Sequence, residues 1–237
     1  MSPQIIQFRN IASHTLVTKF LPKEPVVIDA GANVGEFSMA LSREFGGRCF
    51  AIEPSPEVFE KIETNGSVRK FLFALAGKPG ELELHIGANS VATTLHKASN
   101  GKYLATVRVP ARTLEAFCRE TSIECVDVLK MDIEGEELAV LESCSDAFLQ
   151  GIGQITVEFH EWLGQGTAAD VRRIIARLRA LGFFEFNMGR TVYCDVLFVN
   201  GRYMSRTDYL VAWLNLWIPR FSRAVIRKLG LFKKKPA

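Results

Sequence analysis

The sequence lacks the features of a secreted, membrane-spanning or disulfide-stapled protein. Its five cysteines form no CxxC pair and their number is odd, so they are predicted to be small core residues in a reducing compartment. The first 23 residues have no basic start followed by a long apolar run, so no signal peptide is predicted. No uncharged stretch reaches the roughly 18 residues that a membrane-spanning helix needs. We therefore expect a cytoplasmic protein.

The chain also lacks internal repeats and Gly/Ser-rich linkers. Its 237 residues, 48% hydrophobic and 23% charged, suit one α/β domain of ordinary size. The net charge of +3 is unevenly placed, because residues 201–237 hold nine Lys or Arg and one acid, which leaves the remainder mildly acidic. A nucleic-acid binder would be expected to carry basic charge near its site, so no nucleic-acid partner is predicted.

Apolar runs and helical periodicities alternate along the chain. The run at 25–30 ends in an acid and an alanine, as a buried parallel strand would, and apolar residues then recur at helical spacing. This strand-helix alternation predicts a parallel, doubly wound sheet with right-handed crossovers. The predicted strands are 25–30, 48–52, 70–74, 126–131, 154–159, 183–187 and 193–199.

Three further segments complete the predicted organisation. Alternating residues at 81–86 and 106–109 predict a small antiparallel insertion. Residues 1–200 are expected to form the main domain, in which residues 1–23 are a helical cover. Residues 201–237 are expected to form a separate basic, amphipathic tail.

A glycine turn follows the first strand, where ligands bind in open parallel sheets. Gly31 and Gly35 allow the backbone to pass close to a ligand, and Ala32 and Asn33 lie between them. Asp29 precedes the turn, where its carboxylate is predicted to face an amino group of the ligand or a water beside it.

A second acid is expected at the same edge of the sheet. Glu53 ends the next strand and is followed by Pro54. A carboxylate at that position can accept hydrogen bonds from both hydroxyls of a ribose. Together with the glycine turn, it predicts a nucleoside-containing cofactor.

The residue types favour S-adenosylmethionine (SAM) over a dinucleotide. The pyrophosphate fingerprint is G-x-G-x-x-G, whereas Asn33 occupies its second glycine position here and Glu36 opens the helix. A glutamate at a helix start would repel a pyrophosphate but tolerates the cationic sulfonium of SAM. An NAD-dependent oxidoreductase remains an alternative, as does a glycine turn with a purely architectural role.

Several segments together resemble the FkbM family of SAM-dependent methyltransferases. The similarity covers roughly residues 20–200, and its most specific elements are the combination of DxGANxG with KxDxEGxE. The segments are VVIDAGANVGEFSMAL (26–41), AIEPSPEVF (51–59), VRVPARTLEAF (107–117), LKMDIEGEELAVL (129–141) and ITVEFHEW (155–162).

The resemblance implies a class I (Rossmann-like) methyltransferase fold: a mostly parallel seven-stranded sheet with an antiparallel last strand. It also implies methyl transfer from SAM, usually to a hydroxyl of a saccharide, glycolipid or secondary metabolite. By position, the cofactor would be held by Asp29, Gly31, Ala32, Asn33, Gly35, Glu53, Pro54 and Asp132.

A hydroxyl acceptor needs a group that removes its proton. His160, just past the fifth strand, is the predicted base because its ordinary pKa lies near working pH. Its alternative role is a structural histidine bonded to a loop carbonyl. Asp132 and Glu134 are predicted catalytic residues, with alternatives that include contacts to the SAM amino group and, for Glu134, a helix-start role. Mg²⁺ held with Glu158 is considered but not favoured.

Two predictions concern partners. Residues 90–95 are expected to line the pocket for a small-molecule or glycan acceptor. The tail, with tryptophans among basic residues, predicts either peripheral membrane contact or packing, including dimerisation. The alternative to an enzyme is a non-catalytic subunit with a SAM-binding fold.

Overall fold

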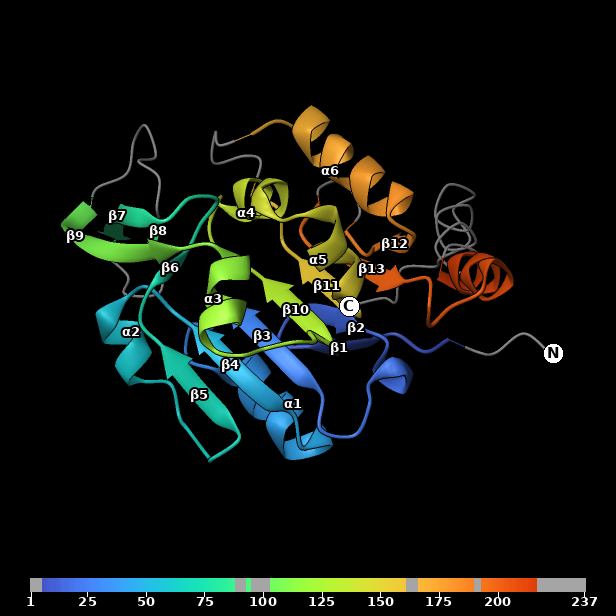
Figure 1. Ribbon diagram of the computed structural model, residues 1–237, viewed down its shortest axis with the longest axis horizontal. Helices are drawn as coiled ribbons and strands as arrows, with labels where there is room; N and C mark the ends of the chain where they lie inside the picture. The colour runs from blue at the N-terminus through green and yellow to red at the C-terminus, as the bar shows by residue number, and fades with distance from the viewer. Residues whose placement is uncertain (1–5, 88–92, 95–102, 161–165, 190–192, 217–237) are drawn as a thin grey trace, which may run out of the picture.

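The structure is a computed structural model, and it describes residues 6–87, 93–94, 103–160, 166–189 and 193–216 (Figure 1). Their centre is a seven-stranded sheet in which every strand is parallel except β13, which is antiparallel to both neighbours. This confirms the predicted class I methyltransferase fold. The strand order is β12 (Phe183–Asn187), β13 (Val196–Asn200), β11 (Gln154–Val157), β10 (Val128–Met131), β3 (Val26–Ala30), β4 (Arg48–Ile52) and β5 (Val68–Phe71).

Helices cover both faces of this sheet, as its fully buried strands require. Alternation of side chains sends Ile28 to one face and Val27 to the other, where each joins a separate core cluster. The first face packs against α3 (Leu114–Glu120), α4 (Glu137–Ser143), α5 (Asp146–Gly151) and α6 (Ala168–Ala180). The second packs against α1 (Glu36–Phe45), and α2 (Pro56–Glu60) follows β4.

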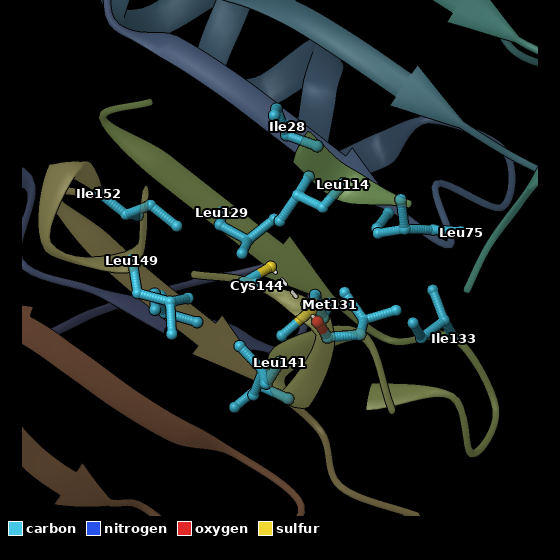
Figure 2. Packing of buried hydrophobic residues seen from close by; sticks show 14 of the residues in the cluster. Ile28, Leu75, Leu114, Leu129, Met131, Ile133, Leu141, Cys144, Leu149 and Ile152 are labelled. Carbon is cyan, nitrogen blue, oxygen red and sulfur yellow. Dashed lines mark hydrogen bonds between the residues drawn. The ribbon is translucent and has the colours of Figure 1, made fainter. Parts of the chain in front are cut away.

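Side chains from strands and helices interdigitate in the first cluster, as Figure 2 shows for Leu129, Met131 and Leu141. Each is fully buried, and burial of such a side chain contributes about 1.5–3 kcal/mol. Three of the five cysteines are buried as predicted, but Cys125 is exposed.

The helix signals in the sequence have the expected consequences. Thr167 and Asp170 form a reciprocal capping box that starts α6, and the inward stripe of this helix includes Ile174 and Leu178. Thr113 accepts a hydrogen bond from the backbone of Ala116 at the start of α3. Local caps therefore set the helix boundaries.

The insertion forms a separate four-stranded sheet rather than an extension of the main one. Its order is β6 (Ala74–Leu75), β9 (Tyr103–Arg112), β7 (Gly80–Gly87) and β8 (Thr93–Thr94), and β7 is antiparallel to β8 and β9. The antiparallel insertion is confirmed. The predicted strand 70–74 is corrected, because the chain leaves the main sheet at Phe71 and enters the second sheet at Ala74.

The predicted helical cover is wrong for the described part of residues 1–23. A hairpin forms instead, from β1 (Arg9–Ile11) and β2 (His14–Leu16), followed by a short 3₁₀ turn at Thr18–Phe20. The two turn residues, Ala12 and Ser13, have φ of 44° and 70°, the positive values that a two-residue hairpin turn requires.

Contacts to β11 and to the residue before β13 hold this hairpin in place. The Thr15 hydroxyl donates to Asp195 at 2.6 Å, just ahead of β13, and the Val17 amide donates to the buried Gln154 at 2.9 Å. The hairpin therefore covers β11 and β13.

Residues 206–216, which belong to the predicted amphipathic tail, are helical. Residues 217–237, which carry most of its basic charge, lie outside the described residues. Within the described part of the chain, no helix has the length and apolar character needed to cross a membrane.

Candidate active site

The glycine turn after β3 takes the left-handed conformations that its sequence predicts. Gly31, Asn33 and Gly35 have φ of 72°, 51° and 84°. A Cβ on Gly31 would lie 1.7 Å from the backbone oxygen of Asp132, so only glycine allows the two loops to meet. The glycine therefore brings the loop after β3 against the loop after β10.

A cleft of about 620 Å³, including its solvent-open part, lies at this edge of the sheet. One part of the wall is apolar and the rest carries carboxylates. The lining residues are Gly31, Asn33, Ile52, Glu53, Pro54, Val58, Ala74, Leu75, Leu84, Asp132, Ile133 and Glu134.

Glu53 is fixed by the backbone around it. One carboxylate oxygen accepts from the Asn33 amide at 3.0 Å, and the other accepts from the Ser55 amide at 2.9 Å. The side chain is only 5% exposed, and burial raises the pKa of Glu53 to about 7 despite these hydrogen bonds. The carboxylate is thus oriented by the same turn that lines the cleft.

Asp29 does not line the cleft, which differs from its predicted role. It lies on the same face of β3 as Val27, so its carboxylate points toward α1 and accepts from the Ser38 hydroxyl at 2.7 Å. Lys130, its register partner on β10, lies 3.2 Å from the other oxygen. Asp29 is fully buried, and its contacts with Ser38 and Lys130 connect α1 and β10 to the strand that leads into the turn.

The remaining residues predicted to hold the cofactor divide into two groups. Pro54 lines the cleft with Asn33 and Gly31. Ala32 is buried and Gly35 begins α1, and neither is among the lining residues. The turn therefore supplies part of the wall, and its other residues support its shape.

The acids after β10 and β11 converge on one histidine. Nε2 of His160 lies 3.6 Å from Asp132 Oδ1, 3.9 Å from Glu134 Oε2 and 3.9 Å from Glu158 Oε1. We call Asp132, Glu134, Glu158 and His160 the acidic cluster. The structure thus brings together all three residues predicted to be catalytic.

Glu137 fixes the ring of His160 from behind. It is buried at the start of α4, where its Oε1 accepts from His160 Nδ1 at 2.8 Å and from the Ile133 amide at 3.0 Å. Burial alone would lower the pKa of His160, but the hydrogen bond and charge of Glu137, with Glu134 and Asp132, raise it to about 9.

That pKa favours a protonated ring at neutral pH, which weighs against proton removal by His160, and its role as general base stays a prediction. The hydrogen-bond partner of its Nδ1 is the carboxylate of Glu137, which the sequence analysis did not name.

The other members of the cluster differ in protonation. Burial opposes ionisation of Asp132, yet His14, whose Nε2 lies 3.7 Å away, and the charge of Lys130 hold the pKa of Asp132 below the usual range. Burial raises the pKa of Glu134 and of Glu158, and neighbouring acids raise both further. Crowded carboxylates thus share a partly desolvated space.

His14 is a site residue that sequence reasoning missed. It comes from β2, is 2% exposed, and its Nε2 lies 3.7 Å from Asp132 Oδ2. It lies before the segments that resemble the FkbM family. Nothing in the sequence pattern predicts that an N-terminal hairpin would bring this histidine beside Asp132. Most of the predicted acceptor loop, residues 90–95, lies outside the described residues; of it, only Thr93–Thr94 is described, as β8.

The groups that line the cleft have the chemistry that SAM requires. Glu53 offers an oriented carboxylate to a ribose, Ile52, Val58 and Leu75 offer an apolar wall to a base, and Asp132 and Glu134 offer negative charge to a sulfonium and an ammonium group. Sheet, turn and cleft define a SAM-dependent methyltransferase of class I. The chain belongs to the FkbM methyltransferase family, whose domain model matches residues 29–184.

Curated relatives share this domain at low identity. Methyltransferase sdnD of Sordaria araneosa is 26% identical over 177 residues, which cover 60% of this chain and 68% of that protein. Hexuronic acid methyltransferase AglP of Haloferax volcanii is 25% identical over 169 residues, with 66% of each chain covered. The 2-O-methyltransferase NoeI of Sinorhizobium fredii is 23% identical over 148 residues, with 54% of this chain and 61% of that protein covered.

Proposed function

We propose that this protein transfers the methyl group of SAM to a hydroxyl oxygen of a saccharide or a related polyhydroxylated acceptor. The observation that carries this proposal is the continuity of the cleft. Glu53 lies at one part of its wall, and Asp132 and Glu134 lie at another. A cofactor anchored through its ribose would direct its other end toward the acids.

The acidic cluster supports a hydroxyl acceptor. Carboxylates accept hydrogen bonds from hydroxyl groups, and several of them placed together can orient a polyol. The names of two relatives, a hexuronic acid methyltransferase and a 2-O-methyltransferase, agree with such an acceptor. The third relative's name states no acceptor, so secondary metabolites stay within the proposal.

SAM supplies an electrophilic methyl group whose bond to sulfur breaks as the new carbon–oxygen bond forms. The acceptor must lose its hydroxyl proton in the same process. We assign proton removal to Glu134, because it lines the cleft and its side chain is 42% exposed, so an acceptor can reach it. Asp132, held between His14 and His160, orients the acceptor.

Transfer from ¹³C-methyl SAM to a panel of uronic acids, neutral saccharides and hydroxylated metabolites tests the proposal. The expected product gains one CH₂ group in mass and shows a methoxy signal by NMR. Glu134→Gln should lower turnover by about 10²–10⁴-fold while S-adenosylhomocysteine (SAH) affinity changes little. Glu136→Gln, an adjacent acid that does not line this cleft, is the matched control.

A different outcome would overturn the proposal. Methylation at nitrogen or carbon would refute the assignment to oxygen. SAH binding without transfer to any member of the panel would favour the non-catalytic alternative. Equal turnover of Glu134→Gln and Glu136→Gln would remove Glu134 from the reaction.

A further inference from the structure

We propose that Asp132, Glu158 and His160 bind one divalent transition-metal ion of the Mn²⁺ type at the acidic cluster. Their ligand atoms, two carboxylate oxygens and His160 Nε2, all lie within 4.8 Å of one another. The residues come from the loops that follow two adjacent strands, β10 and β11. The fold therefore places them together without any contribution from the tail.

The spacing of these atoms fits a shared cation. Ligands at about 2.1 Å from a six-coordinate ion are about 3.0 Å apart when adjacent and about 4.2 Å apart when opposite. The distances from His160 Nε2 to Asp132 and Glu158, 3.6 and 3.9 Å, fall between those values.

The residues behind the cluster provide a second, independent argument. Glu137 accepts a hydrogen bond from His160 Nδ1 at 2.8 Å, which aims Nε2 at the acids, and a metal bound there would displace the Nε2 proton to solvent. Carboxylate–histidine pairs of this kind orient metal-binding imidazoles. His14 is 2% exposed, and its Nε2 lies 3.7 Å from Oδ2 of Asp132, the oxygen that does not face His160, so it supports the Asp132 carboxylate from the other side.

The mixture of donors selects the kind of ion. Carboxylates alone would suit Mg²⁺ or Ca²⁺, whereas an imidazole nitrogen shifts preference to transition metals. A six-coordinate ion with three protein ligands keeps three positions for other oxygens. On the proposed function, these positions would take adjacent acceptor hydroxyls beside Glu134, and the metal would ease loss of a hydroxyl proton.

Mn²⁺ alone is the probe, because its binding is visible without any transfer reaction. The full chain, freed of metal with a chelator, is titrated with Mn²⁺ in the presence of SAH, and free Mn²⁺ is followed by electron paramagnetic resonance. We expect one ion per chain and pulsed-resonance modulation from a ligating ¹⁴N. Glu158→Gln and His160→Gln should each weaken binding at least tenfold, and His160→Gln should lose the ¹⁴N signal.

The control is Glu36→Gln, which removes an exposed acid from the start of α1, outside the cluster. It should bind Mn²⁺ as the natural protein does. Absence of binding at millimolar Mn²⁺, equal affinity in Glu158→Gln, or a bound ion without ¹⁴N modulation would each overturn the metal site. If His160→Gln does not fold, the Mn²⁺ affinity of Glu158→Gln and the ¹⁴N signal of the natural protein still test the metal site.

The outcome is separate from that of the proposed function. Metal binding by a protein that methylates none of the acceptors would uphold the site and refute the acceptor class. Methyl transfer to the acceptors by a protein that binds no Mn²⁺ would uphold the acceptor class and refute the metal site.

Discussion

Lys130 Nζ lies 3.2 Å from Asp29 Oδ1, and both side chains are almost completely buried. The two residues are register partners on adjacent parallel strands, so their side chains extend from the same face of the sheet. Lys130 also donates to the carbonyl oxygen of Gly31 at 2.5 Å. The ion pair therefore ties the glycine turn to β10, the strand that leads into the acidic cluster.

Lys130→Met should destabilise the protein by about 3–5 kcal/mol, because it leaves the Asp29 carboxylate buried without a counter-charge. The free energy of unfolding in urea measures this. Adding Asp29→Asn to the variant should recover part of the loss, since the uncompensated charge is then removed. Lys61→Met, which breaks an exposed pair with Glu57, should cost about 0–1 kcal/mol. Equal losses for the two lysine variants would contradict the buried-pair argument.

The affinity for SAH should depend on pH through Glu53. Burial raises the pKa of this residue to about 7, and the ionised form is the better acceptor for ribose hydroxyls. We expect affinity to fall as pH drops from 8 to 6, by up to about tenfold per pH unit below the pKa. Calorimetry at several pH values measures it. Glu53→Gln should bind about 10-fold to 100-fold more weakly at pH 8 and show little pH dependence; unchanged affinity in that variant would contradict the ribose contact.

The same residue should lower the stability of the free protein at alkaline pH. Its folded-state pKa of about 7 exceeds the ordinary value of 4.5, so the folded state holds more protons between these values. The free energy of unfolding contributed by Glu53 therefore falls as pH rises through that window. At pH 8, Glu53→Gln should unfold at higher urea concentration than the natural protein, with the exposed Glu57→Gln as control. A less stable Glu53→Gln would show that its two backbone hydrogen bonds outweigh its desolvation.

The main sheet was predictable because its signals are local. Buried strands such as 26–30 and 48–52 are mostly apolar, and capping residues such as Thr167 mark helix starts within a few positions. The hairpin at 9–16 was not predictable on these grounds, because its turn residues are Ala12 and Ser13 and not the usual Asn-Gly. Its stability depends on contacts, such as Thr15 with Asp195, that are 180 residues apart in sequence.

The site was predictable in position but not in detail. Strand ends identified Glu53, Asp132 and His160, since topology alone brings such residues to one edge. The sequence did not tell which face of β3 the Asp29 side chain would take. In the structure, side chains alternate along the strand, and Asp29 faces α1 together with Val27. The protonation of His160 depends on Glu137, whose importance follows only from its burial.

Membrane contact by the tail stays a prediction, and the helix at 206–216 gives it a test. Leu210, Trp213 and Leu214 recur at helical spacing and are 55%, 38% and 38% exposed, whereas Ala212 on this helix is buried. Replacing the three exposed residues with Ser should reduce sedimentation with anionic vesicles and leave SAH affinity unchanged. A shift in oligomeric state without any vesicle binding by the natural protein would instead favour dimerisation.

Two glycines have almost the same backbone conformation but different surroundings, so substituting each one distinguishes the cost of backbone strain from the cost of a steric clash. Gly31 and Gly66 have φ of +72° and +80°, but a Cβ on Gly66 would have no atom within 4 Å. Gly66→Ala should therefore cost only the left-handed conformation, about 1–2 kcal/mol. Gly31→Ala must also displace the backbone of Asp132, so we expect a larger loss of unfolding free energy and loss of SAH binding. Urea unfolding and calorimetry on both variants measure these effects. If Gly31→Ala lost no more stability than Gly66→Ala and still bound SAH, the meeting of the two loops at Gly31 would not be what shapes the cofactor site.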